Sequence, residues 1–230
     1  MDNKMNFADI LASTLHDTKN SLGVLLNNID DIIVSCREKN CDRHAEFYAM
    51  QYEIQRLNNS LIRLLSLYKA EKSQLSANID YQAIEDVLDE VATTHEILLN
   101  SRGIHLYTES EEGLFWAFDR NLVAGVLDNV INNAFRYAQN TVKIRAFTEN
   151  GYLVLQIEDD GRGYPPSMLI NENKQPEFKQ EIDFKTGSTG LGLYFSLMVA
   201  GMHVNNDKKG FISVMNGGSL GGGIFSIYLP

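Results

Sequence analysis

The chain contains few cysteines and prolines, and it lacks long hydrophobic runs. Its two cysteines are too few for a disulfide scaffold, and neither has a histidine at ligand spacing, so we expect incidental thiols. The longest apolar runs, such as residues 61–67, contain polar or charged residues and are far too short to cross a bilayer. The first four residues have no apolar core like that of a signal peptide. These absences predict a cytoplasmic chain with no membrane segment.

Basic residues are outnumbered by acidic ones. The chain has 20 Lys and Arg against 30 Asp and Glu, which gives a formal net charge of −10. This balance argues against general binding to nucleic acid or anionic lipid. Hydrophobic residues make up 44% and charged residues 22%, which fits a soluble globular protein. A length of 230 residues suffices for one large domain or two small ones.

The mostly apolar seam positions of the first part of the chain repeat in steps of three and four, as expected for two helices packed nearly parallel or antiparallel. They are Phe7, Leu11, Leu15, Thr18, Leu22, Leu25, Ile29 and Ile32, followed by Phe47, Met50, Ile54, Leu57, Leu61, Leu64 and Tyr68. The stretch between them, residues 36–44, is polar and suits a turn. Leu26, Ile33, Ile62 and Leu65 widen both stripes beyond a two-helix seam. The simplest way to cover them is a homodimer with a four-helix bundle. The alternative is packing on the second half of the same monomer.

Residues 72–78 look like a short linker, and segments of helix and strand character alternate after it. Helices are predicted over residues 82–101, 121–138 and 190–202, the second one capped near Asp119. Strands are predicted over residues 104–108, 114–118, 141–148, 152–158, 211–215 and 223–229, and Asn150-Gly151 favours a tight hairpin turn. A mixed sheet with helices on one face, an α+β fold, is the natural packing.

One histidine stands out on the first predicted helix. His16 directly follows a seam position, so its side chain is expected at the flank of the bundle, where solvent can reach it. Asp17 adjoins it, and Asn20 lies four residues further on and shares its face. An oriented, neutral imidazole can act as a nucleophile. Taken alone, the pattern also fits a plain surface histidine.

Two glycine-rich segments could hold a nucleotide. In residues 159–163 a strand runs into Gly161 and Gly163, which let the backbone approach a ligand, and Asp159 can accept a hydrogen bond from an exocyclic amine. Residues 187–193 open a helix whose free amide groups can bind phosphate. The segment is neither a Walker loop, because no Gly-Lys-Ser/Thr follows, nor a Rossmann fingerprint, because it lacks the βαβ context.

The helix predicted over residues 121–138 carries Asn129 and Asn133 four residues apart on one face. Amide oxygens can coordinate magnesium together with phosphate oxygens, and Arg136 can add positive charge near the phosphates. Taken alone, this pattern also fits an ordinary helix with solvent-facing amides.

In their order and spacing these segments resemble the sensor histidine kinase family. Residues 16–20 look like its phosphoacceptor box, 129–134 like its asparagine box, 159–163 and 187–193 like its two glycine boxes, and 217–230 like its closing hairpin. The resemblance spans nearly the whole chain. It implies a dimerisation and histidine-phosphotransfer domain over residues 1–74. A catalytic ATP-binding domain over residues 79–230 would follow, with a Bergerat-type α/β sandwich.

The resemblance also implies ATP and Mg²⁺ as cofactors. The adenine amine would meet Asp159, and Mg²⁺ would bridge the phosphates and Asn133, with Asn129 close by. His16 would take the γ-phosphoryl group and pass it to an aspartate of a response-regulator receiver domain. Asp17 and Asn20 match the family's pattern for dephosphorylating that regulator. Further nucleotide contacts are expected from Arg136, Tyr137, Gly161, Gly163, Thr189, Gly190, Leu191 and Gly192. Residues 164–189 are expected to form a lid.

The chain departs from the family pattern at Ser21, where a proline commonly follows the phosphoacceptor box and bends the helix. We also find no sensor segment, so the chain is expected to be a fragment or to receive its signal from a separate protein.

The competing interpretations are an ATP-driven clamp, a non-enzymatic phosphotransfer or scaffold protein, and a serine/threonine kinase of the anti-sigma type. Asn129 argues against the clamp, because an amide cannot take a proton from water as the clamp's glutamate does.

Overall fold

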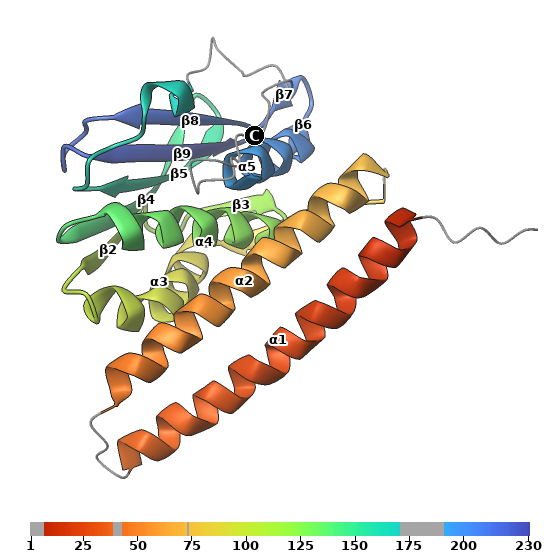
Figure 1. Ribbon diagram of the computed structural model, residues 1–230. Helices are drawn as coiled ribbons and strands as arrows, with labels where there is room; N and C mark the ends of the chain where they lie inside the picture. The colour runs from red at the N-terminus through yellow and green to blue at the C-terminus, as the bar shows by residue number, and fades with distance from the viewer. Residues whose placement is uncertain (1–6, 39–42, 73, 171–190) are drawn as a thin grey trace, which may run out of the picture. The chain divides into compact units, whose positions relative to one another are not determined.

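The computed structural model describes residues 7–38, 43–72, 74–170 and 191–230 (Figure 1). The chain divides into two compact units, Met1–Leu75 and Ser76–Pro230. The first unit is a helical hairpin and the second combines a mixed sheet with helices. The predicted α+β fold class is therefore confirmed.

The hairpin consists of α1 (Phe7–Glu38) and α2 (His44–Glu71). No proline interrupts either helix, and α1 runs unbroken through Ser21. Leu15, Ile29 and Ile33 of α1 are buried, and Gln51 Nε2 donates a hydrogen bond to Asp30 Oδ1 across the hairpin (2.5 Å). Apolar packing at these positions thus holds the two helices together, whereas Leu25 and Ile32, which were also predicted in the seam, are exposed.

Cys36, near the end of α1, is buried and disulfide-bonded. The expectation of an incidental thiol was therefore wrong for this residue. The number of cysteines and their spacing in the sequence do not show which sulfur atoms lie close together in the folded chain.

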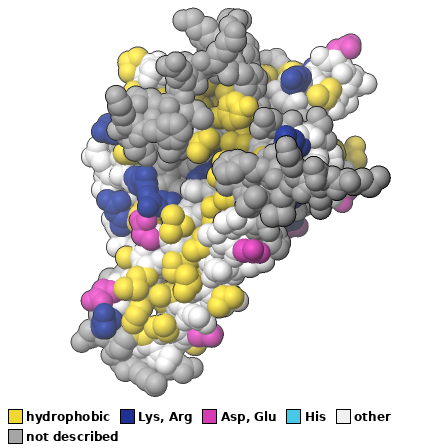
Figure 2. Space-filling view, turned by 45° about the vertical axis from the view of Figure 1, so that its right-hand side comes forward, with side chains coloured by type: hydrophobic (Ala, Val, Ile, Leu, Met, Phe, Trp, Pro, Cys, Tyr) yellow, Lys and Arg dark blue, Asp and Glu magenta, His cyan; other side chains and the backbone are white. Residues whose placement is uncertain are grey.

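Both helices of the hairpin carry exposed apolar side chains. Leu25 and Ile32 of α1 lie seven residues apart, and Met50, Leu57 and Leu64 of α2 follow one another at the same interval. Their exposed fractions range from 38% to 51%. Residues seven apart lie on one side of a helix, so each helix presents a continuous apolar stripe. Figure 2 shows hydrophobic side chains gathered on the surface of the hairpin.

The second unit is built on a five-stranded sheet in the order β2-β4-β5-β9-β8. The strands are β2 (His105–Ser110), β4 (Thr141–Glu149), β5 (Tyr152–Asp159), β8 (Phe211–Asn216) and β9 (Gly223–Leu229). Strands β2 and β4 are parallel and the other neighbours are antiparallel, so the sheet is mixed as predicted. At the β4–β5 turn, Asn150 and Gly151 have φ angles of 53° and 75°, the left-handed conformation that a tight hairpin needs.

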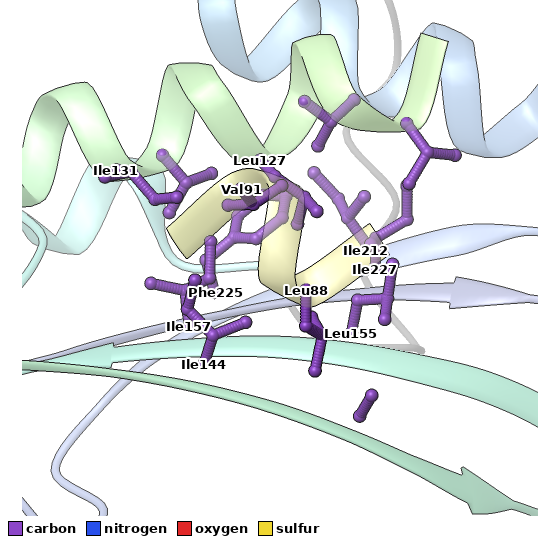
Figure 3. Close-up of a cluster of buried hydrophobic side chains, with 14 of the residues drawn as sticks. Leu88, Val91, Leu127, Ile131, Ile144, Leu155, Ile157, Ile212, Phe225 and Ile227 are labelled. Atoms are coloured by element: carbon purple, nitrogen blue, oxygen red, sulfur yellow. The ribbon is translucent and has the colours of Figure 1, made fainter. Parts of the chain in front are cut away.

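Three helices pack on the sheet: α3 (Ile84–Asn100), α4 (Arg120–Tyr137) and α5 (Leu191–Met202). Figure 3 shows Leu88, Val91, Leu127 and Ile131 from α3 and α4 above the sheet residues Ile144, Leu155, Ile157, Ile212, Phe225 and Ile227. Each of these side chains is at most 4% exposed. Burying one such side chain contributes about 1.5–3 kcal/mol, so this layer fixes where the helices lie over the sheet.

Some short elements were not predicted. Strand β1 (Asp80–Ala83) pairs with β3 (Phe115–Phe118), and two-residue strands β6 (Val204–Asn205) and β7 (Lys208–Lys209) form a second ribbon. A 3₁₀ turn, η1 (Pro166–Met168), lies within the predicted loop. These pieces are too short to show an alternating pattern. The other predicted helices and strands are present, with ends shifted by one or two residues.

The start of α4 is held by a buried polar network. Asp119 caps the helix, because its Oδ1 accepts from the Leu122 amide (2.9 Å), while its Oδ2 accepts from the Asn78 amide (2.7 Å). The Asp119 amide donates to His203 Nε2 (3.0 Å), and His203 Nδ1 donates to the Val199 carbonyl (2.8 Å). This arrangement requires neutral His203, and burial lowers its pKa.

We therefore expect the stability contributed by His203 to be lost in acid. A histidine whose folded-state pKa is lowered gives its full contribution above the unfolded pKa of about 6.5 and loses it as the pH falls further. At pH 7.5, His203→Gln should lower the free energy of unfolding by about 1–3 kcal/mol, because it disturbs the acceptor of the buried Asp119 amide.

The measurement is urea unfolding of the wild type and His203→Gln between pH 5 and 8. The stability difference should shrink as the pH falls below about 6.5. The control is His105→Gln, since His105 is exposed on β2. A difference that stays constant over the whole pH range would contradict the assignment.

Candidate functional site

Helix α4 presents the two asparagines one turn apart. Asn129 is buried and Asn133 is half-buried, while Arg136 and Tyr137 at the end of the helix are exposed. Both amides therefore lie where the helix meets the rest of the unit, and the charged and aromatic residues lie at its rim.

Asp159 is the last residue of β5, and one of its carboxylate oxygens accepts hydrogen bonds from backbone amides nearby. Its Oδ1 accepts hydrogen bonds from the amides of Gly161 (2.8 Å) and Gly223 (3.4 Å). Within the described part of the chain, Oδ2 accepts no hydrogen bond, so it can receive one from a ligand. Burial raises the pKa of Asp159, the two backbone hydrogen bonds oppose this rise, and neighbouring Asp160 adds to it.

Glycines allow three chain segments to pack closely together beside Asp159. A Cβ on Gly161 would overlap the Tyr137 carbonyl oxygen, and a Cβ on Gly222 would overlap the Asp159 carbonyl oxygen. Gly163 has a φ of 76°, and a Cβ there would lie 2.6 Å from Asn216 Oδ1. The turn after β5, the end of α4 and the start of β9 are therefore in direct contact.

Asp160 fixes the end of α4 to the end of β5. Its carboxylate accepts hydrogen bonds from the backbone amides of Gln139, Asn140 and Thr141 at 2.8–3.1 Å. Burial raises the pKa of Asp160, but these hydrogen bonds outweigh burial and leave the pKa below its usual value. Sequence reasoning did not single out this residue, although its acidic side chain beside the glycine turn is a signal for such a cap.

The start of α5 lies against Asn129. A Cβ on Gly192 would overlap the side-chain amide of Asn129, so only glycine allows this approach. Leu191 and Gly192 of the second glycine segment are thus beside the asparagine helix. Thr189 and Gly190, and most of the predicted lid, lie outside the described residues.

Arg162 was also not predicted as a site residue. Its guanidinium lies 4.7 Å from the centroid of the Tyr137 ring, which is a cation–π distance. The pair places a positive charge where the first glycine segment meets the end of the asparagine helix.

The expected acceptor box lies on α1, in the other unit. His16 is within the helix, but its side chain is outside the described atoms. Asp17 and Asn20 are exposed, as expected for a flank of the hairpin. His16 and the residues around Asp159 belong to different units, and each unit is described by itself.

The described residues contain no group of three or more His, Cys, Asp or Glu side chains that could hold a metal ion. In the same residues, no helix is both long and apolar enough to cross a membrane. A cation in this site would therefore rely on amide oxygens and on oxygens of a bound ligand.

Comparisons with known proteins agree with this geometry. Residues 118–230 match the family model described as histidine kinase-, DNA gyrase B-, and HSP90-like ATPase. The sensor protein RstB of Escherichia coli (strain K12) is 27% identical over 195 residues, covering 81% of this chain and 42% of RstB. The chain is similar to sensor histidine kinases, and residues 118–230 match the ATPase family that includes histidine kinases, DNA gyrase B and HSP90.

Two solved histidine kinase structures share the fold. Acinetobacter baumannii histidine kinase AdeS has a TM-score of 0.58 at 22% identity, covering 89% of this chain and 95% of that one. Full-length ShkA in complex with AMPPNP has a TM-score of 0.59 at 18% identity, covering 95% and 45%. At such identities the likeness supports the fold alone. The chain spans less than half the length of RstB.

The contact between Gly192 and Asn129 gives a direct test of the site. Gly192→Ala should weaken ATP binding by about tenfold or more, because the added methyl group displaces Asn129 or the start of α5. Binding is measured by isothermal titration with ATP and Mg²⁺.

The matched control is Gly201→Ala in the same helix. Its Cβ would meet only the flexible end of Lys209, at 3.2 Å, so ATP affinity should stay within about twofold. Equal affinities for the two variants would show that Gly192 has no role in nucleotide binding.

Proposed function

We propose that this chain is an ATP-dependent protein-histidine kinase that phosphorylates itself on His16. Two close approaches at glycine carry the proposal: Gly192 lies against Asn129, and Gly161 lies between Asp159 and the end of α4. The same chain also bears the His16-Asp17 pair. The matched family of ATPases supports ATP as the phosphoryl donor.

ATP would bind with its adenine amine donating to Asp159 Oδ2, the carboxylate oxygen that accepts no hydrogen bond from the described residues. Gly161 and Gly163 allow the turn after β5 to pack closely beside Asp159. The amides of Thr189, Gly190, Leu191 and Gly192 at the start of α5 are proposed to face the phosphates. Arg136 and Tyr137 would line the same wall at the end of α4.

Asn133 and Asn129 would hold Mg²⁺. The two asparagines lie one helical turn apart, and the described residues form no cluster of carboxylates around them, which suits a cation bound mainly through phosphate oxygens. When bound, Mg²⁺ would neutralise charge on the phosphates.

His16 would attack the γ-phosphorus in line. A bond forms between an imidazole nitrogen and phosphorus, the bond from phosphorus to the β–γ bridging oxygen breaks, and ADP leaves with that electron pair. An imidazole with a pKa of about 6.5 is mostly neutral at pH 7, so its lone pair is available. Asp17 would accept from the other ring nitrogen and orient the attacking one.

The phosphoryl group would then pass to an aspartate of a response-regulator receiver domain docked on the hairpin. Exposed Asp17 and Asn20 support a second activity, the dephosphorylation of that regulator, in which the amide orients a water molecule. The signal would come from a sensor segment or a separate upstream protein.

The two domains of this proposal are a dimerisation and phosphotransfer domain over residues 1–74 and a catalytic domain over residues 79–230. The exposed apolar stripes of α1 and α2 support a homodimer, because a second hairpin would cover both stripes in one four-helix bundle.

The central test is labelling with γ-³²P-ATP and Mg²⁺ in the wild type, His16→Ala and Asn133→Ala. We expect an alkali-stable, acid-labile label on the wild type only, because one variant lacks the acceptor and the other a phosphate-site ligand. Incorporation should fall by more than about 100-fold in His16→Ala, since no other nucleophile replaces the imidazole.

His105→Ala is the matched control and should label like the wild type, since His105 is an exposed residue of β2. Equal labelling of His16→Ala would reject the acceptor assignment. An acid-stable label would indicate a serine/threonine kinase, and steady ATP hydrolysis without any label would indicate an ATPase clamp.

The dimer is tested by Leu57→Glu, which places a charge within the exposed stripe of α2. Sedimentation velocity should show a wild-type dimer and a Leu57→Glu monomer, because an unpaired charge in an apolar interface costs several kcal/mol. Val24→Glu is the control: Val24 is 59% exposed but next to, not within, the Leu25–Ile32 stripe. A monomeric wild type would contradict the proposed bundle.

A further inference from the structure

Tyr164 lies against the same glycine as the Asp159 carboxylate. A Cβ on Gly223 would be 2.7 Å from Tyr164 Cε2 and 2.8 Å from Asp159 Oδ2. The ring edge and the carboxylate oxygen therefore flank a single backbone position. Asp159 Oδ2 is the oxygen that accepts no hydrogen bond from the described residues.

The backbone of Tyr164 is fixed on both sides. Its amide donates to Asn216 Oδ1 (2.6 Å), and its carbonyl accepts from Asn216 Nδ2 (2.8 Å). Gly163 before it is left-handed, and Pro165 after it restricts the chain further. The ring packs against the hydrophobic core. Tyr164 is thus held in place before any ligand binds.

The phenol group of Tyr164 is available as a donor. No hydrogen bond to its hydroxyl is present among the described residues. Burial raises the pKa of Tyr164, and the negative charge of Asp159 raises it further. The hydroxyl therefore stays protonated at neutral pH. A half-buried tyrosine whose hydroxyl has no partner among the described residues favours a ligand atom that can accept its hydrogen.

We propose that Tyr164 and Asp159 together recognise the base of the bound nucleotide. The Tyr164 hydroxyl donates to adenine N1, and Asp159 Oδ2 accepts from the neighbouring 6-amine. This inference rests on the proposed ATP-binding function and adds a second specificity contact. An acceptor and a donor side by side on the base edge match a tyrosine and a carboxylate that flank one backbone position on the protein.

The test compares ATP with 1-deaza-ATP, in which N1 is replaced by a C–H group and the 6-amine is kept. Binding to the full chain is measured by equilibrium dialysis for the wild type and Tyr164→Phe. The wild type should bind ATP about 3- to 10-fold more tightly than 1-deaza-ATP, the range expected for one hydrogen bond. Tyr164→Phe should bind both nucleotides equally, at the weaker affinity.

Tyr107→Phe is the matched control, since Tyr107 is an exposed tyrosine of β2 and should keep the wild-type preference. Unchanged thermal unfolding of Tyr164→Phe would show that the fold is intact. Tyr164→Phe that binds ATP as tightly as the wild type, or that loses the same affinity for both nucleotides, would overturn the inference. A wild type that binds neither nucleotide would instead overturn the proposed function.

Discussion

Close approach of backbone to neighbouring atoms at glycine is the constraint on which the nucleotide site depends. Gly192 brings α5 against the Asn129 amide, and Gly161 brings the turn after β5 against the end of α4. Gly222 brings the start of β9 against Asp159. A single added Cβ at any of them would push two elements apart. The glycine segments therefore assemble the site by packing, besides any amide groups they offer to a ligand.

Helix α4 is fixed at both ends by aspartates. Asp119 caps its first turn and is joined to buried His203, whereas Asp160 accepts the amides of the turn that follows the helix. Core side chains such as Leu127 and Ile131 hold its middle on the sheet. A helix anchored in this way keeps Asn129 and Asn133 at a constant place relative to Asp159, and such preorganisation reduces the cost of binding a ligand.

Periodicity predicted the long elements well, because α1, α4 and β5 each repeat their apolar residues over several turns or pleats. The Asp119 cap and the Asn150-Gly151 turn were predicted because each is a local signal of one or two residues. Contacts between distant segments were not predicted. Tyr164 beside Gly223, Asp160 beside Asn140, and His203 beside Asp119 depend on how the sheet orders its strands, and no local pattern reports that order.

The polar network at the start of α4 also bears on how the two units are joined. Because the Asn78 amide donates to Asp119, the chain is fixed to the second unit at the residue that caps the asparagine helix. Between Glu71, the last residue of α2, and Asn78 the chain spans at most about 25 Å when fully extended. Any movement of the His16 hairpin relative to the nucleotide site is therefore confined by a short tether. In the proposed reaction, phosphoryl transfer requires in-line contact, so this tether would limit the orientations from which His16 could approach ATP.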